Sequence, residues 1–97
     1  MRLALKRSGG IAGLTLRAEV ETEELPEEEG RELRELVRRT NIEGLAERGS
    51  RPRGADRYQY DVAVEDGDHR ARAVVSGEHV PPELRSALDR LLQRQLG

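Results

Sequence analysis

The chain contains no cysteine, tryptophan or phenylalanine, and its only aromatic residues are two tyrosines. Without cysteine it can form neither a disulfide framework nor a thiolate metal site, so cysteine usage does not indicate a redox compartment. No apolar run reaches membrane-spanning length, and the apolar stretch before Lys6 is far shorter than the apolar region of a signal peptide. We therefore expect a cytoplasmic protein that does not associate with a membrane.

Charge of one sign is also lacking, because 17 basic residues stand against 19 acidic ones and the net charge is −2. This balance does not favour a nucleic-acid partner held by counterion release. Sixteen of the 17 basic residues are arginine, which fits planar recognition of carboxylates or a compositional bias of the genome. The length of 97 residues predicts a single domain over residues 1–97.

What the chain does have is apolar residues in periodic runs, which indicate a folded protein although 37% of the residues are charged. A period of two predicts two pairs of strands, each joined as an antiparallel hairpin. SGGIAG joins the first pair, and the tight-turn signal Asp66-Gly67 joins the second. The residues expected to face the core are Leu3 and Leu5, then Leu14, Leu16, Ala18 and Val20, then Tyr58, Tyr60, Val62 and Val64, and finally Ala71, Ala73 and Val75.

Two helices are predicted, one after each hairpin. The first begins at Pro26, carries the stripe Leu33, Leu36 and Val37, and ends near Asn41. Gly30 lies inside it at an expected cost of about 1 kcal/mol relative to alanine, so this helix should depend on packing. Residues 46–57 show no period and are predicted to form a loop. The last helix opens at residues 80–83 and carries the stripe Leu84, Leu88, Leu91 and Leu92, with Leu96 as an extension.

The predicted fold is therefore α+β with the order ββαββα. It is a four-stranded antiparallel sheet with the two helices packed on one face. The other face should stay in water, because the residues of opposite parity are polar: Arg17, Glu19, Gln59, Asp61, Arg70 and Arg72.

No catalytic, metal or cofactor site is predicted. His69 and His79 have no i+4 partner and no cysteine nearby, so we interpret them as solvated loop histidines. No buried carboxylate pair and no nucleophile motif can be identified from spacing. We expect a protein that is not an enzyme.

Residues 10–13 fit a GxxG pattern, but neither phosphate binding nor a KH-type site is expected. A P-loop needs a Lys, a Ser or Thr and a following helix, and the KH loop joins two helices, whereas this segment joins two strands. A hairpin loop that needs positive φ, with Ile11 capping the core, also accounts for the pattern. An RNA-binding sheet would stack bases on exposed aromatics, but Tyr58 and Tyr60 have the parity of the buried side.

Four stretches together resemble the emfourin family, inhibitors of thermolysin-like zinc metalloproteases such as protealysin that occur in bacteria. They are MRLALKRSGGIAG, LPEEEGRELRELV, PRGADRYQYDVAVEDG and VPPELRSALDRLLQ, and the resemblance extends from the first of them to the last, over nearly the whole chain. SGG and RGADRYQY are the most specific parts. The resemblance implies a small α+β protein without a cofactor that binds such a protease and blocks its active-site cleft. We expect the free protein to be a monomer.

Within that resemblance, the glycine segment gains a functional interpretation. Thermolysin-like enzymes favour a bulky apolar residue just after the bond they cut, and the dipeptide Gly10-Ile11 matches this preference. We expect the segment to enter the cleft as an added strand, with Ile11 in the apolar subsite. The predicted contacts are Ser8, Gly9, Gly10, Ile11 and Ala12.

A second candidate surface is the arginine-rich segment 51–57, since arginine can pair with an acidic rim on the protease. Arg51, Arg53 and Asp56 are its predicted contacts, and the glycine segment is preferred over it. The alternative function is a small nucleic-acid-binding or regulatory adaptor domain that uses the arginines of the open sheet face.

Overall fold

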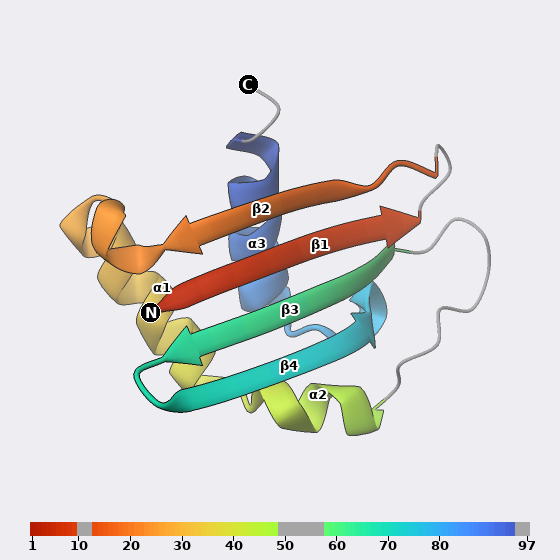
Figure 1. The fold of residues 1–97 in the computed structure, drawn as a ribbon. Coiled ribbons are helices and arrows are strands. Elements are labelled where there is room, and N and C mark those ends of the chain that lie inside the picture. Colours follow the sequence, from red (N-terminus) through yellow and green to blue (C-terminus); the bar gives the residue numbers. More distant parts are fainter. Residues whose placement is uncertain (10–12, 49–57, 95–97) are drawn as a thin grey trace.

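The computed structural model describes residues 1–9, 13–48 and 58–94, with the side chains of residues 46–48 left out of the description. Its elements follow the predicted order with one helix added (Figure 1). The strands are β1 (Arg2–Gly9), β2 (Leu16–Glu21), β3 (Tyr58–Asp66) and β4 (His69–Ser76); the helices are α1 (Glu27–Arg39), α2 (Ile42–Arg48) and α3 (Pro82–Arg94), with 3₁₀ turns η1 (Thr22–Glu24) and η2 (Gly77–His79).

The four strands form one antiparallel sheet in the order β2-β1-β3-β4. Both predicted hairpins are confirmed, and β1 joins them by pairing with β3. Leu5 has Ala18 and Val62 as its register partners, so apolar side chains of three strands line up across one face. Gly67 takes a φ of 65° at the tight turn between β3 and β4, a conformation that favours glycine.

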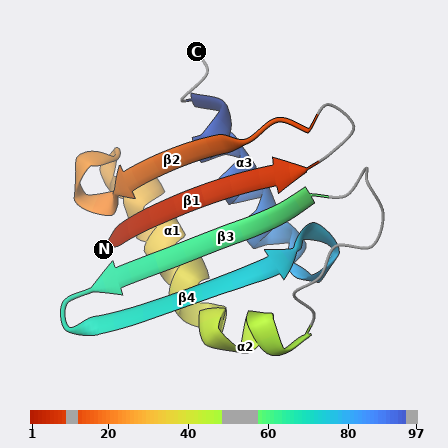
Figure 2. The same cartoon turned by 45° about the vertical axis from the view of Figure 1, so that its right-hand side comes forward.

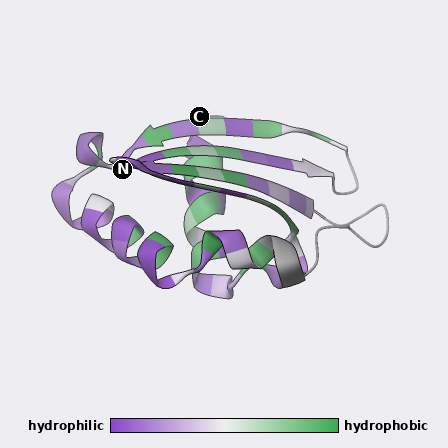
Figure 3. Cartoon of the chain, turned by 60° about the horizontal axis from the view of Figure 1, so that its bottom comes forward, coloured by the Kyte–Doolittle hydropathy of each residue, from purple (hydrophilic) through white to green (hydrophobic). Residues whose placement is uncertain are grey.

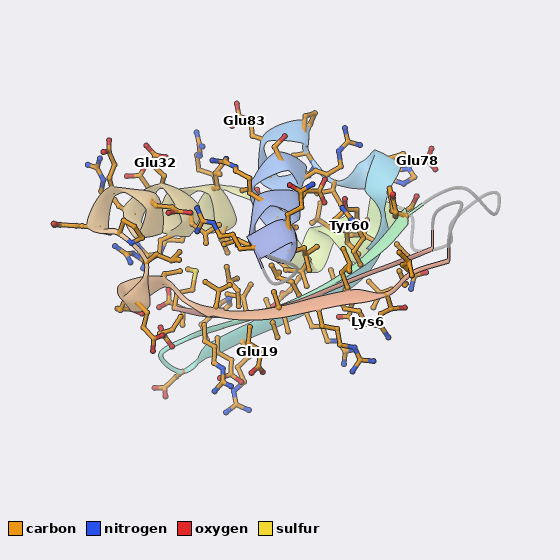
Figure 4. All side chains as sticks on the ribbon, turned by 90° about the horizontal axis from the view of Figure 1, so that it is seen from above. Lys6, Glu19, Glu32, Tyr60, Glu78 and Glu83 are labelled. Atoms are coloured by element: carbon orange, nitrogen blue, oxygen red, sulfur yellow. The ribbon has the colours of Figure 1, made fainter. Side chains whose placement is uncertain are left out.

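The helices cover a single face of the sheet, as predicted. Figure 3 shows the sheet and the helices as two layers, with apolar and polar residues alternating along the strands, and in Figure 4 Tyr60 points towards the helices while Lys6 and Glu19 extend from the opposite face. All four residues of the predicted α3 stripe are buried: Leu84, Leu88, Leu91 and Leu92. None of the helices within the described ranges is long and apolar enough to cross a membrane.

The prediction of a loop over residues 46–57 is wrong at its beginning, because residues 46–48 belong to α2. The short helix starts after Asn41, whose side-chain Oδ1 accepts a hydrogen bond from the Gly44 N–H at 3.2 Å in the manner of an N-cap. Ile42 and Leu45 are both buried, and α2 packs against β4. Two apolar residues were too few to establish a helical period in the sequence.

Leu14 was predicted to face the core, and this is wrong. Its side chain is 66% exposed and lies before β2, which begins at Leu16. The pairing between β1 and β2 ends at Arg7 and Leu16, so Leu14 lies beyond the paired part of the hairpin. The strand parity therefore does not continue back to Leu14.

The first turn of α1 packs closely against η1. Gly30 is buried there, and a Cβ at this position would lie 2.5 Å from the backbone oxygen of Thr22. No side chain can be added at that distance without moving backbone, so the glycine in this helix is required by the close approach of two segments.

The Met1 ammonium joins the start of β1 to the same region. It donates to Glu23 Oε1 at 2.9 Å and to Glu21 Oε1 at 3.3 Å. The Met1 side chain is 1% exposed. A hydrogen bond with the Glu21 side chain and the bond from the ammonium lower the pKa of Glu23 to about 2 from 4.5. The bond to Glu23 raises the pKa of the ammonium, although burial opposes this.

Glu23→Gln is therefore expected to lower the free energy of unfolding at neutral pH. Because the pKa of Glu23 is lowered in the folded state, its contribution is fully present above pH 4.5 and is lost as the pH falls towards about 2. Urea unfolding of wild type and variant across this range should show the difference shrinking as the solution becomes more acidic. Glu24→Gln is the control, since Glu24 is exposed and makes no ion pair within the described part of the chain; a constant difference across the range would contradict the assignment.

Candidate protein-binding site

The structure brings the two predicted contact segments to the same end of the sheet. Gly9, the last residue of β1, is the register partner of Tyr58, the first residue of β3. Residue 10 follows Gly9 and residue 57 precedes Tyr58, so both segments join the sheet at neighbouring positions (Figure 2). We call this region, residues 7–9, 13–16 and 58–60, the loop end.

Of the predicted contact residues, Ser8 and Gly9 lie in β1 and are half-buried. Gly9 has a φ of 95°, which confirms the expectation that the glycine segment needs positive φ where it leaves the strand. The other predicted contacts lie outside the described residues: Gly10, Ile11, Ala12, Arg51, Arg53 and Asp56.

The loop end carries the exposed large apolar side chains of the described structure. These are Leu14, 66% exposed, and Tyr58, 44% exposed. Tyr58 was predicted to face the core, and this is wrong because it stands at the very start of β3, whereas Tyr60 is only 2% exposed, which confirms that it packs in the core. Exposed leucine and tyrosine at one end of a highly charged molecule are typical of a surface that contacts another protein.

A polar cluster holds the loop end to α3. Asp89 Oδ1 accepts two hydrogen bonds, from the Tyr60 hydroxyl at 2.6 Å and from Arg7 Nη1 at 2.9 Å. The Arg7 guanidinium carbon lies 4.6 Å from the centre of the Tyr58 ring, a cation–π geometry. The end of β1, the start of β3 and the middle of α3 are thus linked through these four side chains.

The electrostatics of the cluster keep its groups in fixed roles. Burial and the bond to Asp89 raise the pKa of Tyr60, so its hydroxyl stays protonated and donates. Burial disfavours the charged form of Arg7, but the interactions with Asp89 and Tyr60 together outweigh it, so the pKa of Arg7 is raised. Arg7 is 15% exposed at its side chain, so its charge is directed to Asp89.

The open sheet face offers fewer free cations than the sequence indicated. Arg72 donates to both carboxylate oxygens of Asp61, at 3.0 and 2.7 Å, and Arg70 Nε lies 4.0 Å from Glu65. Neither tyrosine points to this face, since Tyr60 is buried beneath the helices and Tyr58 shares its parity. The nucleic-acid alternative therefore lacks a stacking platform on the part of the face that the structure describes.

The histidines differ from each other in their surroundings. His69 is exposed at the start of β4, in agreement with the prediction of a solvated residue. His79 was expected to be solvated too, but it is half-buried at the end of η2, with Nδ1 4.0 Å from Glu78. Over the described ranges, no three His, Cys, Asp or Glu side chains gather in a way that could hold a metal ion.

The sequence analysis did not identify Arg7, Asp89 or Leu14 as parts of this site. A signal for Arg7 was present, because it shares the buried parity of Leu3 and Leu5 at a strand end. Its partner lies 82 residues away on a helix, and no spacing rule connects them.

The described residues form a small two-layer α+β domain that carries its exposed large apolar side chains at the loop end. A family model described as Emfourin matches residues 5–92. The chain therefore belongs to the emfourin family, the inhibitors of protealysin-type metalloproteases, and its general role is metalloprotease inhibition. No curated protein matches the chain. No solved structure matches it either.

Proposed function

We propose that this protein inhibits a thermolysin-like, protealysin-type zinc metalloprotease by occluding its active-site cleft with the loop end. Family membership supports the class of target. The observation that carries the choice of surface is the pairing of Gly9 with Tyr58, which places the attachment points of both candidate segments side by side. The exposed Leu14 and Tyr58 flank the same position.

In this mechanism the glycine segment, residues 8–13, enters the cleft in an extended form. Backbone hydrogen bonds to the enzyme would add it as a strand, and the small side chains of Gly9 and Gly10 permit close approach. Ile11 fills the apolar subsite that follows the scissile position. The segment is then bound as a substrate would be.

Inhibition rather than cleavage requires that the bound peptide bond stay away from the reactive geometry. The segment leaves from β1, a central strand whose neighbours β2 and β3 hold it on both sides, and Gly9 is still paired with Tyr58 at its last residue. In this proposal, anchorage at the paired Gly9 holds the bound peptide bond out of the position that attack on its carbonyl carbon requires, and small displacements of this kind reduce catalytic rates strongly.

The arginine-rich segment 51–57 contributes a second contact in the same complex. It enters β3 directly at Tyr58, beside the glycine segment. Arg51 and Arg53 would pair with carboxylates on the rim of the cleft, which affects the association rate and its dependence on salt.

Titration of the purified protein into a protealysin-type enzyme with a small peptide substrate tests the function. We expect stoichiometric loss of activity, with one chain per enzyme as for a monomeric inhibitor. A serine protease treated in the same way is the control for class and should keep its activity. Full turnover of the metalloprotease with excess protein would refute the proposal, and steady cleavage of the protein on gels would show a substrate instead.

A further inference from the structure

We propose that Tyr58 contacts the protease directly, and that Arg7 and Asp89 are positioning residues that hold its ring ready for that contact. This inference rests on the proposed function and extends it to a surface outside the glycine segment. Three observations support it: Tyr58 is exposed, Arg7 stacks on its ring, and Asp89 accepts hydrogen bonds from both Arg7 and Tyr60.

Tyr58 departs from the rest of its strand. It shares the helix-side parity of Tyr60 and Val62, which are 2% and 1% exposed, yet it is 44% exposed itself. An aromatic ring left partly in solvent at the loop end of the sheet provides a large contact area with few rotatable bonds. Such rings are enriched among the residues that contribute most to protein–protein binding.

Arg7 restricts the ring before any partner arrives. Its guanidinium lies 4.6 Å from the ring centre, so it occupies one side of the ring and leaves other parts exposed. Arg7 can keep this place because its Nη1 donates to Asp89 at 2.9 Å. A side chain already ordered in the free protein loses less conformational entropy on binding.

Asp89 is suited to fix both groups because it comes from a different layer. It lies on α3, and its Oδ1 also accepts a hydrogen bond from the hydroxyl of the buried Tyr60, which fixes the position of the carboxylate. The hydrogen bonds to Asp89 thereby hold the loop end of the sheet against α3. The nearby η2 adds to this, since a Cβ on Gly77 would lie 3.1 Å from the Tyr60 ring.

The chemistry of the contact follows from what is already satisfied. The charge of Arg7 is committed to Asp89, so what Tyr58 itself presents to a partner is an apolar ring and a hydroxyl. The matching surface on the protease is an apolar rim next to the subsite for Ile11. Loss of Tyr58 should therefore weaken binding to a similar extent at low and high salt, in contrast to charge pairs of the arginine-rich segment.

The first test compares single variants by their inhibition constants for a protealysin-type enzyme. We expect Tyr58→Ala to raise the constant about tenfold or more, the size typical of an aromatic contact residue. Arg7→Lys keeps a cation for Asp89 but loses the planar group that stacks on the ring, and should cause a smaller rise. Asp61→Asn disrupts a different Arg–Asp pair, that of Arg72 and Asp61 on the open face of the sheet, and should leave the constant unchanged.

The second test is a double-mutant cycle that separates positioning from direct contact. If Arg7 acts through Tyr58, adding Arg7→Lys to Tyr58→Ala should produce no further loss of inhibition. The chain has two tyrosines and no tryptophan, so near-UV circular dichroism of the free protein reports on these rings, and Arg7→Lys should change that signal. Equal losses from Arg7→Lys in both backgrounds would overturn the positioning role.

Failure of this inference is distinguishable from failure of the proposed function. If wild type does not inhibit any protealysin-type enzyme, the function is wrong. If wild type inhibits and folded Tyr58→Ala inhibits equally well, the function stands and the contact at Tyr58 is refuted. Thermal melting of every variant ensures that folded proteins are compared, and Tyr58→Phe serves as the variant that retains the ring.

Discussion

Ile11→Asp is expected to raise the inhibition constant by about thirtyfold or more while the melting temperature stays close to that of wild type. Truncating a central apolar anchor costs about 2 kcal/mol or more, and about 1.4 kcal/mol corresponds to a factor of ten in affinity. Aspartate adds the cost of placing a charge in an apolar subsite. Enzyme assays across inhibitor concentrations, with thermal melting of both proteins, measure the two quantities.

Ile11→Leu is the matched control, since it keeps the apolar volume and should inhibit nearly as well as wild type. Unfolding of Ile11→Asp would assign Ile11 to the core, where the alternative interpretation of the glycine segment places it. Normal inhibition by the folded variant would exclude the segment as the inserted part. The double change Arg51→Glu with Arg53→Glu would then examine the other segment at the same end.

Gly30→Ala is expected to destabilise the protein, although helix propensity alone predicts the opposite sign. Alanine favours a helix interior by about 1 kcal/mol over glycine. Here its Cβ would lie 2.5 Å from the backbone oxygen of Thr22, so α1 or η1 must move. Overpacking against backbone costs about 1 to 3 kcal/mol, which offsets or exceeds the gain. Urea unfolding at neutral pH gives the net free energy.

Gly44→Ala provides the comparison within a helix. A Cβ at Gly44 would lie 2.7 Å from the Asn41 side-chain amide, which can rotate away, whereas Thr22 at Gly30 presents a carbonyl of the main chain. We expect Gly44→Ala to be the milder of the two changes. If Gly30→Ala stabilised the protein by the full propensity difference, the close approach of α1 and η1 would be refuted.

The layered architecture could be predicted because alternation and helical spacing are properties of short stretches. Leu3 and Leu5, or Leu84 and Leu88, reveal their buried faces without knowledge of any distant partner. α2 was not predicted, because its packing depends on only two apolar residues, Ile42 and Leu45. The prediction for Leu14 was wrong because strand pairing ends at Leu16, whereas the alternation in the sequence continues back to Leu14.

The site was predictable in part, for a different physical reason. Glycines and a lone isoleucine mark the first segment by composition, and arginines mark the second. That both attach beside the pair Gly9 and Tyr58 depends on β1 pairing with β3, a long-range arrangement. The cluster of Arg7, Tyr60 and Asp89 depends on the docking of α3 as well, which no local pattern encodes.

The bond between Arg7 and Asp89 also has a meaning for biogenesis. The hairpin of β1 and β2 can form from local sequence soon after it leaves the ribosome. The bond from Arg7 to Asp89 can form only when α3 has been synthesised and has docked. A nascent chain halted before α3 would display the glycine segment on an unsupported hairpin. Full inhibitory strength is therefore expected to appear late in translation, after α3 has docked on the sheet.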